Sequence, residues 1–183
     1  MDGRASRPLN FYDTIFEVID MRSFSNLWFW IALAVLWSSV SHWVLGVPYD
    51  MIMRARRQGG EAMEDLEDLT RVSVKRLVMI ADVAGIVLAL VVSAVMTTLL
   101  LMAFVYGVEF AQAIVLLLLP LTLLGVLSIR AARRIQNESL RDAELIKCLL
   151  RHRFATQLIG VAAIFVTAMF GMYQNLAVAF PGY

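Results

Sequence analysis

The sequence contains one cysteine and two histidines in 183 residues, which limits the chemistry that the chain can perform alone. A disulfide needs two cysteines and an iron–sulfur or zinc cluster needs several, so Cys148 cannot build any of these within one chain. Two histidine ligands of a haem would have to lie level with each other. At 1.5 Å of helix rise per residue, His42 and His152 are expected roughly 10 Å apart in depth. We therefore expect no metal site and no cofactor.

Enzyme motifs are absent as well. The chain has no glycine-rich phosphate-binding loop, no zinc-protease helix motif and no nucleophile elbow. Its arginine clusters could bind lipid head groups or nucleic acid, but neither ligand is needed if the arginines anchor the protein in a membrane. We expect a protein that is not an enzyme and that binds no nucleic acid.

The sequence is rich in apolar residues, and they form long runs. Hydrophobic residues make up 60% of the chain and the mean hydropathy is +0.73, whereas soluble domains are nearer half apolar. Crossing a hydrocarbon core takes roughly 20 helical residues. Four runs are long enough, at about residues 26–47, 77–106, 110–129 and 154–176. We predict an all-α integral membrane protein with four transmembrane helices, in which residues 1–183 form a single membrane domain.

The basic residues are concentrated in two connections between these runs. Of the 16 lysines and arginines, six lie within residues 48–76 and seven within residues 130–153. Short cytoplasmic loops carry an excess of basic residues, so both connections should be cytoplasmic and both termini periplasmic, in a bacterial inner membrane. Both connections have helical patterns, with a turn at Gly59–Gly60 and a break near residues 136–139. They should form a helical cytoplasmic cap.

The N-terminal segment, residues 1–25, has the pattern of an amphipathic helix on the periplasmic side. Its polar face is acidic and would not be attracted to anionic lipid, so a protein partner is as plausible as a lipid surface. The apolar face consists of Tyr12, Ile15, Phe16 and Ile19.

Small residues recur about every four positions in two of the predicted spans. Such stripes let helix backbones approach closely in a membrane. They could pack these two spans against each other or form an oligomer interface. The second span contains Ala81, Gly85, Ala89 and Ser93, and the fourth contains Gly160, Ala163, Thr167 and Gly171.

Polar side chains from all four spans should share one layer, roughly 7 Å inside the cytoplasmic boundary at 1.5 Å per residue. Ionisable groups at such depth are costly and usually face the bundle interior or a partner. The layer could be a proton or ion site with Asp82 as carrier and His42 as titrating partner. It could also be a structural hydrogen-bond cluster, or Asp82 could pair with Arg130. The predicted members are Ser38, Ser41, His42, Asp82, Ser128, Arg130 and Gln157.

Three segments carry a resemblance to known proteins, namely FEVIDMRSFSNLWFWIALAVLWSSVSHWVLGVPYDM, YGVEFAQA and FVTAMFGMYQNL. The chain resembles, over nearly its whole length, an uncharacterised family of small polytopic membrane proteins from Rhodobacterales-type alphaproteobacteria. Members of this family are often described as a component of the SufBCD complex, which would imply iron–sulfur cluster assembly. The resemblance assigns no role to any residue of this chain.

These observations favour a non-catalytic inner-membrane accessory or assembly subunit. Its partners would be membrane lipid and other integral membrane proteins, further copies of itself, or both. The alternative is a homo-oligomeric ion or proton channel, or a small transporter, that uses the inner polar layer as its site.

Overall fold

The structure of the chain, a computed structural model, describes residues 27–179. The predicted amphipathic helix of residues 1–25 lies outside the described residues. The described part is almost entirely helical, with one short hairpin. Its elements are α2 (Leu27–His42), β1 (Trp43–Val44), β2 (Val47–Pro48), α3 (Tyr49–Gln58), α4 (Gly60–Leu100), η2 (Leu101–Val105), α5 (Glu109–Asn137) and α6 (Asp142–Ala179).

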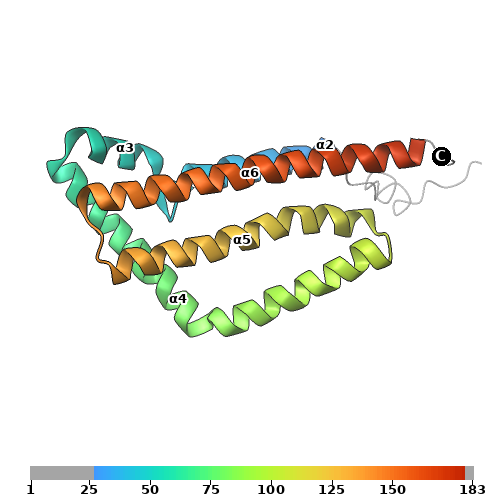
Figure 1. Cartoon of the computed structure of the whole chain (residues 1–183), viewed down its shortest axis with the longest axis horizontal. Helices are drawn as coiled ribbons and strands as arrows, with labels where there is room; N and C mark the ends of the chain where they lie inside the picture. The colour runs from blue at the N-terminus through green and yellow to red at the C-terminus, as the bar shows by residue number, and fades with distance from the viewer. Residues whose placement is uncertain (1–26, 180–183) are drawn as a thin grey trace, which may run out of the picture.

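Three long helices account for most of the molecule (Figure 1). α4 continues without interruption into the π-helical η2, so that one helix of 46 residues runs from Gly60 to Val105. This helix, α5 and α6 are each long and apolar enough to cross a membrane. They contain the predicted spans at residues 77–106, 110–129 and 154–176. At 1.5 Å per residue, 46 residues extend about 69 Å, so roughly half of α4 and η2 would project beyond a hydrocarbon core of about 30 Å.

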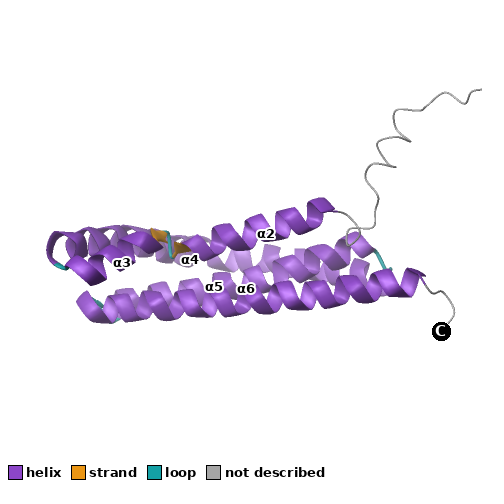
Figure 2. Ribbon diagram, turned by 90° about the horizontal axis from the view of Figure 1, so that it is seen from above, coloured by secondary structure: helices purple, strands orange, loops and turns teal. Residues whose placement is uncertain are grey.

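The first apolar run forms a shorter helix than the sequence indicates. α2 has 16 residues and ends at His42, whereas the predicted span continued to residue 47, where a proline follows at position 48 and would end a helix. A two-stranded hairpin follows, in which Val44 pairs with Val47. Leu45 and Gly46 both have positive φ, 53° and 80°, as a two-residue type I′ turn requires. The chain therefore leaves the helix before the turn, and Pro48 precedes α3 instead of ending α2. In Figure 2 the hairpin lies between α2 and α3.

The largest hydrophobic core lies among the charged segments, in the helical cap formed by residues 48–76 and 130–153. It draws on β2, α3, the first half of α4, the end of α5 and the start of α6. Cys148 is one of its members and is 8% exposed, so it packs as an apolar residue. The break between α5 and α6, at residues 138–141, lies where the sequence indicates. The core consists of Val47, Ile52, Ala55, Leu66, Val74, Val78, Ala132, Ile135, Leu145, Ile146, Cys148 and Leu149.

The opposite end of the molecule is closed by the turn between η2 and α5. Gly107 turns the chain with a φ of 67°. The π-helical turn leaves the carbonyl oxygen of Ala103 available, and the buried Gln112 side chain donates to it through Nε2 at 2.8 Å. Gln174 of α6 in turn donates through Nε2 to Oε1 of Gln112. This hydrogen-bonded chain joins η2, α5 and α6.

The apolar part of α4 differs from those of α5 and α6 in its burial. In the most apolar 18-residue window of each helix, 6% of α4 is buried within the chain, against 33% of α5 and 28% of α6. Figure 1 shows the second half of α4 running apart from α5 before η2 returns to it. α4 is therefore held by the cap core at one end and by the turn at the other.

Candidate functional site

Asp82, the carboxylate of the predicted polar layer, lies on α4 and pairs with an arginine of α5. Nη2 of Arg133 donates to Oδ1 of Asp82 at 2.8 Å, and each side chain is about half exposed. One of the three alternatives from the sequence paired Asp82 with Arg130, which lies three residues earlier on the same helix. Which turn of α5 lies opposite Asp82 depends on the register between two antiparallel helices, and residue spacing along one chain does not determine that register. The ion pair joins α4 to α5.

Removing this carboxylate is expected to affect stability rather than proton transport. Asp82→Asn should lower the free energy of unfolding in mild detergent by about 1–3 kcal/mol, because it leaves the Arg133 guanidinium without its charged partner within the predicted span. It should leave proton leak through liposomes containing the protein unchanged, because the Asp82 carboxylate is already paired with the Arg133 guanidinium. A clear drop in proton flux with unchanged stability would instead support the channel alternative.

Ser128, another predicted member, contacts a histidine that the sequence placed outside the layer. Oγ of Ser128 and Nε2 of His152 are 3.3 Å apart, which links α5 to α6. His152 also accepts a hydrogen bond through its backbone carbonyl from the Thr156 hydroxyl at 3.0 Å. The histidine at the level of Ser128 is therefore His152 of α6.

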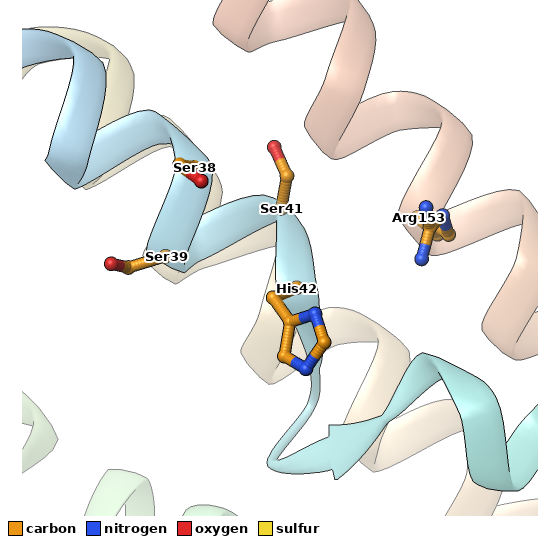
Figure 3. Close-up of a pocket in the computed structure, with 5 residues that line it drawn as sticks. All are labelled: Ser38, Ser39, Ser41, His42 and Arg153. Atoms are coloured by element: carbon orange, nitrogen blue, oxygen red, sulfur yellow. The ribbon is translucent and has the colours of Figure 1, made fainter.

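His42 and the serines of α2 line a polar pocket together with Arg153 of α6 (Figure 3). The pocket is open rather than enclosed and has a volume of about 470 Å³. In Figure 3, α2 contributes the serines and His42 and the facing helix contributes Arg153, and the Ser39 hydroxyl points to the side away from Arg153. The described lining residues are Ser38, Ser39, Ser41, His42 and Arg153, and none of these carries a carboxylate.

Arg153 is held in place by an aromatic ring. Its Cζ atom lies 3.4 Å from the centroid of the Tyr49 ring at the start of α3, a close cation–π contact. The Nη1 atom of Arg153 is buried, and no described residue accepts a hydrogen bond from it. The guanidinium is thus fixed in orientation while part of its donor capacity is unused.

The predicted layer is accordingly divided among three helix pairs. Asp82 joins α4 to α5, Ser128 joins α5 to α6, and the pocket lies between α2 and α6. Arg130 and Gln157, the remaining predicted members, are exposed. Within residues 27–179, no group of three or more His, Cys, Asp or Glu side chains is placed to hold a metal ion.

The small-residue stripe of α6 is a helix contact within the chain. Its four members, Gly160, Ala163, Thr167 and Gly171, are all buried. A Cβ atom added at Gly160 would lie 2.9 Å from Cε3 of Trp37, so the absence of a side chain lets the indole of α2 reach the α6 backbone. Ala163 belongs to a core with residues of α2 and α5. The stripe of the fourth span therefore packs against α2 and α5.

The small-residue stripe of α4 meets none of these helices closely. A Cβ atom added at Gly85 would have no neighbouring atom within 4 Å. Ala89 and Ser93 are exposed, and Ala81 and Gly85 are half-buried. Direct packing of the second span's stripe on the fourth span's stripe was one of the two expectations, and it is wrong for this chain, because α6 uses its stripe for α2 and α5.

Sequence reasoning missed several residues that connect the helices. Arg133, His152 and Arg153 lie in the basic connection, where a positive charge already has an explanation as a membrane anchor. Tyr49 follows the predicted span of residues 26–47, where an aromatic residue is already explained by the membrane–water interface. No spacing signal distinguishes these residues from their neighbours, because each owes its contact to a helix distant in the sequence.

Comparison of the chain with models of known protein families, with curated proteins and with solved structures finds no match to any of them.

Proposed function

We propose that the chain is a non-catalytic subunit of the bacterial inner membrane that binds a transmembrane helix of another membrane protein along α4. The observation that carries the proposal is the contrast between the two small-residue stripes. On α6 such a stripe is covered by neighbouring helices. On α4, Ala89 and Ser93 are exposed, Ala81 and Gly85 are half-buried, and no atom lies within 4 Å of a Cβ atom added at Gly85.

Exposure of large apolar residues would not by itself indicate a partner, because lipid tails solvate them well. Small residues are different, since membrane helices associate through van der Waals contact and close backbone approach rather than through a hydrophobic driving force. α4 is also fixed at both ends, by the cap core and by the turn next to Ala103. A helix held in this way presents a defined surface to a partner.

We further propose the four-span arrangement with both termini periplasmic. The two basic connections come together at one end of the molecule, as Figure 1 shows for α3, the start of α4 and the start of α6. A common end is consistent with both connections facing the cytoplasm. α2 has 16 residues and a length of about 24 Å, and it would be the first of the four spans along the chain. It packs along α6 through Trp37.

Gly85→Leu is the variant that tests the partner surface. The full-length tagged protein, purified from its native membrane in mild detergent, should bring down a stoichiometric foreign membrane subunit. Gly85→Leu should reduce that recovery by at least about tenfold, because a leucine there prevents close backbone approach. Its own thermal stability should stay at the wild-type value, since no atom of the chain lies within 4 Å of the new Cβ position.

Val83→Phe is the matched control, because it adds a comparable number of heavy atoms. Val83 is 83% exposed and lies on the opposite face of α4, two residues before Gly85 in a helix of 3.6 residues per turn. It should leave recovery of the partner unchanged. A pure homo-oligomer from wild type, or equal losses in the two variants, would overturn the proposal.

A further inference from the structure

The pocket between α2 and α6 lies where both helices change from apolar to polar. α2 is apolar until Trp37, and its last turns contain Ser38, Ser39, Ser41 and His42. α6 carries Arg151, His152 and Arg153, and its long apolar run begins at Phe154. A pocket at this level lies at the boundary of the apolar surface, where lipid head groups are found.

The described lining residues give the pocket a positive charge. Arg153 is the charged group among them, and none of these described residues carries a carboxylate. The Tyr49 ring covers the guanidinium, and buried Nη1 lacks an acceptor among the described residues. Because Nη1 is buried within the chain, an anion in the pocket would be held by the part of the Arg153 side chain that lines the pocket.

The donors around the pocket match an anion that has several acceptor oxygens. A guanidinium presents its donors in a planar fork that suits phosphate oxygens. Ser38, Ser39 and Ser41 add hydroxyl groups from α2, the helix that faces Arg153. A volume of about 470 Å³ with an open side has room for a phosphate group that carries a substituent.

We propose that this pocket binds the phosphate group of an anionic phospholipid, with Arg153 as the principal contact and the α2 serines as supporting donors. The pocket's place at the end of the apolar surface favours a lipid over a free ion. The positive charge of Arg153, with no carboxylate among the described lining residues, favours a head group with net negative charge over a zwitterionic one. The proposal does not depend on the partner surface of α4.

A binding titration of the full-length protein in mild detergent tests the proposal. A short-chain phosphatidylglycerol should bind saturably to the wild type and raise its unfolding temperature. Arg153→Gln should weaken binding by about tenfold or more, as expected for loss of a charge-assisted hydrogen bond. Ser41→Ala, which only trims a hydroxyl, should weaken it by about threefold, and it provides a second variant if Arg153→Gln folds poorly.

Arg151→Gln is the matched control. It removes the same charge two residues away, from an exposed arginine that does not line the pocket, and binding should stay within about twofold of wild type. Two further ligands distinguish an anionic lipid from a free anion and from a zwitterionic lipid. Inorganic phosphate and a short-chain phosphatidylcholine should both bind at least about tenfold more weakly than the phosphatidylglycerol. Equal binding of inorganic phosphate would reassign the pocket to a free anion. Equal losses in the Arg151 and Arg153 variants would mean attraction to general surface charge, and either result would overturn the proposal.

Discussion

Leu66→Ala is expected to destabilise the protein by about 2–5 kcal/mol, because it removes a large side chain from the centre of the cap core. Leu66 is fully buried, as are Ile52 and Leu149 from the two segments packed against it. The loss combines the transfer energy of the missing carbons with the cavity they leave. The cap carries many charged residues and would be surrounded by water, so its core is stabilised by the hydrophobic effect to a degree that the spans are not.

Unfolding by sodium dodecyl sulfate in mild detergent would measure this loss, and proteolysis within residues 48–76 would locate it. The control is Val72→Ala on the same helix, where the side chain is 64% exposed and the change should stay within about 0.5 kcal/mol. If Leu66→Ala were as stable as Val72→Ala, the cap would not have the packed core described above.

Gly160→Ala is expected to lower the free energy of unfolding by about 1–3 kcal/mol, because the added methyl group overpacks the contact between α2 and α6. Its Cβ atom would lie 2.9 Å from Trp37 Cε3, closer than van der Waals contact allows. The indole cannot easily yield, since Trp37 is 4% exposed and packs with Leu33 and Leu124. Separation of α2 from α6 would relieve the overlap at the expense of that core.

Gly125→Ala is the matched control for Gly160→Ala. Gly125 lies in α5 with no atom within 4 Å of an added Cβ, so alanine should be neutral or stabilise the helix by up to about 1 kcal/mol. The two substitutions are therefore expected to differ in sign. Trp37→Leu should rescue part of the loss in a Gly160→Ala background, with a coupling of at least about 0.5 kcal/mol in a double-mutant cycle. Absence of coupling would show that the indole does not pack on Gly160.

Local properties of the sequence were sufficient to predict the long helices. A run of apolar residues must form a helix in lipid, because the backbone has no other partner for its hydrogen bonds. The lengths of the runs therefore predict the three long helices, and Gly107 marks the turn between η2 and α5. The helical character of residues 48–76 and 130–153 was predicted from their residue patterns, and the predicted break near residues 136–139 coincides with the end of α5 at Asn137.

The end of α2 was not predicted correctly, because it depends on a turn rather than on hydropathy. Residues 43–47 are apolar enough to extend the run, and Pro48 is a familiar helix terminator. The structure instead uses Leu45 and Gly46 to turn the chain, and the added-Cβ position of Gly46 lies 3.3 Å from Ser73 Oγ on α4. Packing of the hairpin against α4 is a tertiary contact that the apolar pattern does not encode.

The composition and order of the residues alone determined that this is a helical chain with long apolar segments and a charged helical end. Only the tertiary structure decided which polar groups meet, namely Asp82 with Arg133 and Ser128 with His152, and that Arg153 faces the serines of α2. Hydropathy acts on each segment independently, whereas these contacts depend on the rotation and register of helices that are distant in sequence. For the same reason two similar small-residue stripes have different surroundings. The stripe of α6 is buried within the chain, whereas the stripe of α4 is partly exposed.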